Sequence, residues 1–285
     1  MTAAVGVVMA TRDRRDRALA TLDRLADLPE RPPVVVVDNG SGDGTPAAIG
    51  RRHPDVRVIE LGRNAAAAAR TAGVRALDTP LAAFSDDDSW WEPGALRRAV
   101  AVFAEHPCLA LLQGRILVGP GRRLDPTCAA MGRSRVPAPA GLPGPALMGF
   151  VACGVVVRRA PFLAAGGFHP RLGVGGEEEL LALDLAAAGW QLAYVESVVA
   201  HHHPEPGPGR SSRAEVQLRN ALWVAWLRRR PAGALARSAR LTAAALREGR
   251  PGALLEAGRG VPWVLRERRP VPPSVDRAAR LASRS

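Results

Sequence analysis

The sequence contains no lysine, so all 39 of its basic residues are arginine. We attribute this absence to codon usage in the source before attributing it to chemistry. A phosphate-binding loop of the P-loop type needs a lysine after its glycines. That class of nucleotide site is therefore not expected, and the glycines at 40, 42 and 44 do not fit its spacing.

Long apolar runs and paired cysteines are also lacking. No stretch reaches the roughly 18 uninterrupted apolar residues of a membrane-spanning helix, and the first residues lack the pattern of a signal peptide. We therefore expect a cytoplasmic protein. Cys108, Cys128 and Cys153 are far apart and show no metal-ligand spacing, which predicts reduced, structural thiols.

Acidic residues are scarce in the C-terminal part of the chain. Residues 204–285 hold 17 arginines and 6 acidic residues, a net charge of +11, whereas residues 1–203 hold 22 and 21, a net charge of +1. An anionic partner is expected beside the tail, either a polyanionic acceptor or the inner face of the plasma membrane, contacted peripherally. The basic region has no recognisable reading motif, so nucleic acid is not an expected partner.

Apolar runs alternate with helical patterns along the body of the chain. Residues 5–10 and 34–37 are β-branched runs typical of strands buried on both faces of a parallel sheet. Apolar residues recur at helical spacing over 15–28, and the alanine-rich stretch 65–77 predicts a helix with Asn64 as its N-cap. The order predicts an α/β fold with a mostly parallel sheet flanked by helices. Further strands are expected at 56–61, 81–85, 109–118, 150–157 and 191–195, and further helices at 93–106, 158–165 and 177–188.

The C-terminal part reads differently. Helical spacing returns from residue 213, with more helices expected at 232–247 and from 252 onward, before a proline-rich end at 266–285. Basic amphipathic helices with tryptophans favour a membrane interface, although packing against the body is their commoner use. We divide the chain into a domain at 1–204 and a basic helical extension at 205–285. Inside the first domain, residues 120–145 lack periodicity and are expected to be a long connection.

The sharpest chemical signal is an acidic run at the end of a predicted strand. Asp86, Asp87 and Asp88 follow apolar residues 81–84, and adjacent carboxylates repel one another unless they hold a cation. Mg²⁺ and Mn²⁺ take oxygen ligands and often share carboxylates with substrate phosphates, so the run predicts a nucleotide diphosphate site. The alternative is a solvated acidic turn that favours the next helix N-terminus.

Two further polar positions lie near predicted strand or helix ends. Asp38 ends the second strand, where its carboxylate suits a ribose or base edge, or only braces the glycine-rich turn that follows. Arg70 lies on the alanine-rich helix within reach of an anion, although most helix arginines are only solvated.

Later in the chain, Glu177 and Glu178 begin a helix after a run of glycines. One of them would serve as a general base, unless both only favour the helix N-terminus. Three adjacent histidines, 201–203, cannot all face one site, and His201 or His202 is the candidate metal ligand.

Together these stretches resemble the inverting family 2 glycosyltransferases with the GT-A fold, which is Rossmann-like. Residues 34–45 are similar to the family pattern V-V-D-N-G-S-x-D-G-T, residues 64–73 to its N-x-G-x-x-x-A-R-N-x-G helix, and the acidic run to its D-x-D position. Residues 150–168 resemble the acceptor-side strand and G-G-F-D segment, and Glu177-Glu178 stands where the family has E-D. The resemblance covers about residues 4–204. The departures are Ala66, Thr71, His169 and Leu180, which stand where the family has Gly, Asn, Asp and an acid.

The resemblance implies transfer of a sugar from a nucleotide-diphosphate sugar to a hydroxyl of a glycan, a lipid-linked or a small-molecule acceptor, with inversion. Glu178, beside Glu177, would accept the proton of that hydroxyl, and a divalent cofactor, Mg²⁺ or Mn²⁺, would offset charge on the departing diphosphate. The residues it implies are Thr11, Arg12, Asp38, Arg70, Asp86 and Asp87 at the donor, and Asp86, Asp88 and His201 or His202 at the metal.

Two rival classes fit parts of the pattern. A sugar-nucleotide-binding protein that has lost catalysis is suggested by Leu180, His169 and the glutamate at 178. A nucleotidyltransferase shares the α/β nucleotide sheet and acidic metal ligands, but the glycine- and lysine-bearing phosphate loop expected for it is absent.

Overall fold

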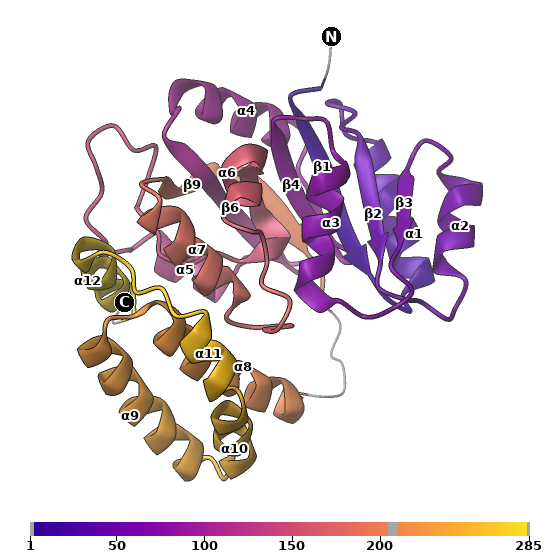
Figure 1. Ribbon diagram of the computed structural model, residues 1–285. Helices are drawn as coiled ribbons and strands as arrows, with labels where there is room; N and C mark the ends of the chain where they lie inside the picture. Colours follow the sequence, from indigo (N-terminus) through magenta and orange to yellow (C-terminus); the bar gives the residue numbers. More distant parts are fainter. Residues whose placement is uncertain (1–2, 205–209, 284–285) are drawn as a thin grey trace.

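A computed structural model describes residues 3–204 and 210–283, which form one mixed sheet covered by helices (Figure 1). The strands are β1 (Val5–Thr11), β2 (Val34–Asp38), β3 (Arg57–Glu60), β4 (Leu81–Asp86), β5 (Ser89–Trp91), β6 (Leu109–Val118), β7 (Arg123–Leu124), β8 (Val155–Arg158) and β9 (Gln191–His202). Their order is β3-β2-β1-β4-β8-β6-β9-β5, with β7 paired to β6. The strands from β3 to β4 run parallel, as their buried apolar runs predict. β8 is antiparallel to both of its neighbours, and β9 is parallel to β6.

Helices cover both faces of this sheet. One face packs against α1 (Arg15–Ala26), α2 (Thr45–Arg52) and α4 (Ala95–Glu105). The other packs against α3 (Ala69–Ala76), α5 (Pro126–Met131), α6 (Arg159–Ala164) and α7 (Glu177–Ala187), of which α3, α6 and α7 lie in front of the sheet in Figure 1. Successive residues of β1 serve opposite faces, because side chains alternate along a strand: Val7 and Met9 belong to one core, Val8 to the other. The predicted α/β fold is thus confirmed.

The C-terminal helices pack beneath the sheet, orange to yellow in Figure 1. They are α8 (Arg210–Arg228), α9 (Pro231–Arg247), α10 (Pro251–Arg259), α11 (Val261–Arg266) and α12 (Pro273–Ala282). Leu180 and Leu183 of α7 share an apolar cluster with Val224 and Leu227 of α8, and Arg228 pairs with an aspartate of α7. The extension is therefore joined to the body through α7. The expected boundary after residue 204 lies at residues 205–209, outside the described residues.

Some elements differ from the sequence expectation. The stretch 120–145 contains β7 and α5, and α5 begins where the Asp125 carboxylate accepts a 2.7 Å hydrogen bond from the Thr127 amide, ahead of Pro126 at the first helical position. The proline-rich end contains α12, which also begins at a proline. In both cases proline starts a helix, a position where its missing N–H costs nothing.

Three further boundaries were set by tertiary contacts. β5 is only three residues long and forms by pairing with β9. The expected strand at 150–157 is regular only at β8, after a 3₁₀ turn, η2 (Ala152–Gly154), and the helix expected from residue 65 begins as another such turn, η1 (Ala66–Ala68). None of the described helices has the length and apolar character to cross a membrane.

Candidate active site

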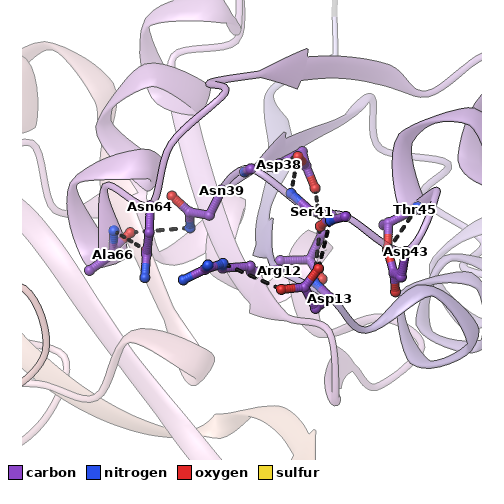
Figure 2. A network of polar contacts seen from close by, with 12 residues as sticks. Arg12, Asp13, Asp38, Asn39, Ser41, Asp43, Thr45, Asn64 and Ala66 are labelled. Carbon is purple, nitrogen blue, oxygen red and sulfur yellow. Dashed lines mark hydrogen bonds and ion pairs between the residues drawn. The ribbon is translucent and has the colours of Figure 1, made fainter.

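The loops after β1 and β2 form a hydrogen-bonded network at the carboxyl edge of the sheet (Figure 2). Asp38 is 2% exposed, and its carboxylate accepts hydrogen bonds from the amides of Gly40 (3.0 Å) and Ser41 (2.9 Å) and from the Ser41 hydroxyl. Ser41 in turn accepts from the Asp13 amide at 2.9 Å. In this structure Asp38 therefore braces the turn that follows it.

Asn39 joins this network to the loop before α3. Its Oδ1 accepts a 3.0 Å hydrogen bond from the Ala65 amide, and its Nδ2 donates to the Ala66 carbonyl at 3.4 Å. Asn64 accepts from the Ala66 amide, so it braces this turn and does not cap the first helical residues of α3. Arg12, paired with Asp13 at 3.4 Å and half-exposed, lies between the two loops in Figure 2, where its guanidinium is open to a ligand.

The three aspartates of the acidic run point in different directions. Asp87 turns inward: it is 7% exposed, and its carboxylate accepts a 2.9 Å hydrogen bond from the Thr11 hydroxyl and lies 3.4 Å from Arg14. Its backbone carbonyl accepts a 2.7 Å bond from Thr21 of α1. Burial raises the pKa of Asp87 to about 6, although Thr11 and Arg14 oppose the shift. Thr11 and Asp87 thus lie on the buried side of the acidic run and hold its turn in place.

Asp88 faces the end of β9. Its Oδ1 lies 3.4 Å from Nε2 of His202, and its Oδ2 lies 3.3 Å from Arg17 and 3.6 Å from Arg14. Burial lowers the pKa of His202, but the contact with Asp88 outweighs it, so that the pKa is raised. The carboxylate and the imidazole are thereby held as neighbours.

His201 lies elsewhere, since alternate residues of a strand face opposite sides. Its ring stacks on Trp90 with centroids 5.5 Å apart, and burial lowers its pKa. Of the two candidate histidines, the fold brings only His202 to the acidic run.

Asp88 and His202 could supply an oxygen and a nitrogen ligand to Mg²⁺ or Mn²⁺, ions that take several further ligands from water and phosphate. Within the ranges that the structure describes, no three His, Cys, Asp or Glu side chains are grouped to hold a metal by themselves. The donor set therefore fits an ion that arrives with a phosphate-bearing ligand.

Asp86 faces the opposite way, toward α3 and α7. Its Oδ1 contacts Nη2 of Arg70, and its amide donates a 2.6 Å bond to the Ser89 hydroxyl, which closes the turn into β5. Arg70 is also close enough to Glu177 and Glu178 to interact with both electrostatically. One guanidinium thus lies between the acidic run and the start of α7.

Glu178 is placed by the segment before β8. Its Oε1 accepts a 3.0 Å hydrogen bond from the Ala152 amide. That segment is fixed by the fully buried Gln113, which accepts from the Val151 amide at 2.7 Å and donates to the Gly154 carbonyl at 2.9 Å. Burial, together with the charge of Glu177, raises the pKa of Glu178 to about 8. Such a carboxylate is a much stronger base than an exposed one.

Glu177 is 5% exposed, burial raises its pKa, and its Oε2 has no hydrogen-bond partner among the described residues. The loop ahead of it is held by α8. Asn220, fully buried, donates from Nδ2 to the carbonyls of Leu172 (2.5 Å) and Gly175 (2.6 Å). Gly175 and Gly176 have φ near +90°, and a Cβ at Gly175 would lie 2.5 Å from Gln217 of α8. Glycine is therefore needed for both backbone conformation and space.

Sequence reasoning did not identify Arg14, Arg17, Gln113 or Asn220. Arg17 lies on α1 and Arg14 directly precedes that helix, positions where arginine is usually solvated, and no motif distinguishes them. Gln113 could be noticed in part, as a polar residue that directly follows the apolar run 109–112 inside the strand expected at 109–118. Asn220 lies in the extension, for which the sequence predicted only packing against the body and membrane contact.

A family model described as "Glycosyl transferase family 2" matches residues 6–162, more than half of the chain. Among characterised proteins, an N-acetylglucosaminyl-diphospho-decaprenol L-rhamnosyltransferase of Mycobacterium tuberculosis is 27% identical, over 74% of this chain and 79% of the relative.

Solved structures resemble the fold. A mannosyltransferase from Pyrobaculum calidifontis, in complex with GDP-Man and Mn²⁺, aligns over 99% of this chain and 75% of its own with a TM-score of 0.62 and 20% identity. TarS from S. aureus, residues 1–349 in complex with UDP-GlcNAc, aligns over 78% of this chain and 65% of its own with a TM-score of 0.61 and 18% identity. At these identities the likeness demonstrates a shared fold.

Proposed function

Because this chain belongs to glycosyltransferase family 2, we propose that it transfers a sugar from a nucleotide-diphosphate sugar to an acceptor hydroxyl with inversion at the anomeric carbon. The observation that carries the proposal is the position of Glu178: a carboxylate with a pKa raised to about 8, separated from Asp86 by Arg70. A single displacement requires a base and a diphosphate-binding group close to each other, and Arg70 interacts with both Asp86 and Glu178.

In this mechanism the Glu178 carboxylate takes the proton of the acceptor hydroxyl. The acceptor oxygen forms its bond to the anomeric carbon as the bond from that carbon to the diphosphate oxygen breaks, and the diphosphate leaves with the electron pair. Attack from the face opposite the leaving group inverts the configuration. Arg70 favours the charged form of Glu178 and so opposes the effect of burial.

The donor would lie along the carboxyl edge of the sheet. Arg12 and the loops joined by Asn39 would contact the nucleotide, with Asp38 holding its loop in shape and still available to the ribose or base through a lone pair. Asp86 would face the ribose and diphosphate. Thr11 and Asp87 would act from behind by fixing the turn that presents Asp86 and Asp88.

Asp88 and His202 would hold the divalent ion, Mg²⁺ or Mn²⁺, which supplies Lewis acid assistance to the departing diphosphate. The 3.4 Å distance between Oδ1 of Asp88 and Nε2 of His202 supports this assignment. Arg17 and Arg14 keep Asp88 oriented before the ligand arrives.

A lipid-linked acceptor is our choice among acceptor classes, since the name of the mycobacterial relative contains a diphospho-decaprenol substrate. The surplus of arginine in residues 204–285 would then bring the protein to the anionic membrane surface that carries such an acceptor.

The first experiment is a thermal-shift screen of nucleotide diphosphates with and without Mn²⁺, on the wild type, on Asp88→Asn and on the exposed control Asp55→Asn. A bound ligand at about 100 times its Kd stabilises the fold by roughly 2.7 kcal/mol, enough to identify the nucleotide. We expect a Mn²⁺-dependent shift that Asp88→Asn loses and Asp55→Asn keeps. Shifts without any donor hydrolysis or transfer would instead indicate a binding protein that has lost catalysis, and no shift would contradict the nucleotide site.

A further inference from the structure

Exposed apolar side chains gather on the C-terminal helices. Of the seven large apolar residues that are exposed in the described chain, five lie between residues 235 and 265 on α9, α10 and α11. They are Leu235 (58% exposed), Leu246 (63%), Leu255 (61%), Val261 (47%) and Leu265 (55%).

These helices also enclose an apolar groove of about 620 Å³, which is within the range of ligand pockets. Leu222, Trp223 and Trp226 of α8 line it on one side, and residues of α9, α10 and α11 line it on the others. The indole N–H groups are already satisfied, that of Trp223 by the Ala257 carbonyl at 2.9 Å and that of Trp226 by Ser238 at 3.0 Å. Arg219 lies over the Trp223 ring and Arg268 over the Trp226 ring, so an occupant of the groove would meet the apolar ring surface that these guanidinium groups leave open.

The groove opens toward the exposed apolar residues. Val261 and Leu265 both line it and are exposed. On α9, Leu235, Thr242 and Leu246 share one face, because residues spaced by seven and four lie close together around a helix, and Thr242 lines the groove. The apolar surface thus continues from inside the groove onto α9.

Positive charge borders this surface. Arg259 and Arg266 directly follow two groove residues, Gly258 and Leu265, and both are exposed. Within the described chain neither side chain takes part in an ion pair or hydrogen bond, whereas Arg219 and Arg228 of α8 and the adjacent Arg229 are all paired with carboxylates. The region around them carries a net charge of +11. A second copy of this chain would bring the same charge to the groove and be repelled.

We propose that this groove binds one acyl chain of an anionic membrane phospholipid, with Arg259 and Arg266 at its phosphate head group. The hydrocarbon fills the space against the two tryptophans, and the guanidinium groups pair with the phosphate. The inference rests on the membrane contact within the proposed function and does not depend on the transfer reaction. It adds a defined lipid-binding site to the general electrostatic attraction between the basic region and an anionic membrane.

The test uses the tryptophans in the groove. Vesicles of phosphatidylglycerol and phosphatidylcholine with brominated acyl chains quench a tryptophan only when a chain touches it. We expect such vesicles to quench the full-length protein, and vesicles of phosphatidylcholine alone to do so far less. Gly258→Phe should fill the groove, since a Cβ at this helical position meets nothing within 4 Å, and should weaken quenching at least about tenfold. Arg259→Gln with Arg266→Gln should weaken it as well.

Gly50→Phe is the matched control, because Gly50 is also helical and exposed, has the same open space, and lies on α2, away from the groove. It should be quenched like the wild type. Equal quenching of Gly258→Phe and the wild type would overturn the proposal. So would pelleting of the protein with vesicles without quenching, because that would indicate binding through surface charge alone. A dimer in solution that Gly258→Phe dissociates would also overturn it. Nucleotide-induced thermal shifts of the same variants show separately whether the donor site is intact.

Discussion

The side-chain amide of Asn220 donates a 2.6 Å hydrogen bond to the carbonyl of Gly175, a residue 45 positions earlier in the chain and two before Glu177. The helical extension thus contacts the body and holds the loop from which α7 starts. A residue outside the region matched by the family model therefore acts on the position of the proposed base.

Asn220→Leu keeps the approximate size of the side chain and removes the bonds donated to the carbonyls of Leu172, Val174 and Gly175. These carbonyls lose their partner, and we expect the free energy of unfolding to fall by about 2–4 kcal/mol, measured by urea unfolding. The loop should loosen, so kcat should fall about tenfold or more while KM for the donor changes little. An unchanged kcat in a variant that is still folded would count against a positioning role.

Glu178→Gln should lower kcat by about 10²–10⁴-fold, the usual contribution of a general base. In the wild type kcat should rise with pH and level off above about 8, the pKa to which Glu178 is raised. Rate profiles of both proteins measure this. A wild-type profile that is flat between pH 6 and 9 would exclude Glu178 as the base.

The same pKa predicts a stability effect. Below pH 4.5 Glu178 is protonated in folded and unfolded chains, but between 4.5 and about 8 only the unfolded chain releases the proton, so the wild type loses stability as pH rises. Glu178→Gln should match the wild type near pH 4 and exceed it at pH 8 by on the order of 1–3 kcal/mol. Melting curves of the wild type and Glu178→Gln at pH 4 and pH 8 measure this difference in stability.

Arg70→Gln removes the positive charge between Asp86 and Glu178. Arg70 lowers the pKa of Glu178, so the variant should show a rate profile displaced to higher pH, with a larger loss at pH 7 than at pH 9. Arg75→Gln, an exposed arginine on the same helix, is the control. Equal losses at both pH values would show that Arg70 binds the donor without tuning the base.

Asp87→Asn tests whether Asp87 supports the turn of the acidic run or contacts the nucleotide directly. Because Asp87 is directed toward Thr11 and α1, nucleotide affinity by calorimetry should change less than about threefold, whereas Asp88→Asn should lower Mn²⁺-dependent affinity by about tenfold or more. Burial raises the pKa of Asp87 from 3.8 to about 6, so the wild type loses stability as pH rises between these values, and the variant should lose less. Equal loss of affinity in both variants would place Asp87 at the donor.

Much of the fold could be predicted, because its strands are buried on both faces and appear as continuous apolar runs. The strand expected at 109–118 coincides with β6, and the acidic run follows the apolar part of β4 as expected. β5 could not be predicted, since its three residues show no period and depend on pairing with β9. The helices in proline-rich segments were missed because proline at a helix start resembles proline in a loop.

The types of residue at the site could be predicted better than the directions in which their side chains point. An alternating strand implies that His201 and His202 face opposite sides, but which one faces Asp88 is set by the register of β9, including its shift beside Gly114. Likewise nothing in three adjacent aspartates indicates that the middle one points inward. These choices are made by partners distant in sequence, Thr11 and Arg14 for Asp87.

The pairing of β5 with β9 also fixes the order in which this site can be completed. Asp88 meets His202 only after the last strand has added to the sheet, where the His203 amide donates to the Asp88 carbonyl at 2.8 Å. During synthesis, which proceeds from the N-terminus, the loops after β1 and β2 and the acidic run emerge long before that strand. A nascent chain therefore carries the acidic run before His202 can contact it, so the pairing of Asp88 with His202 forms only when the sheet is complete.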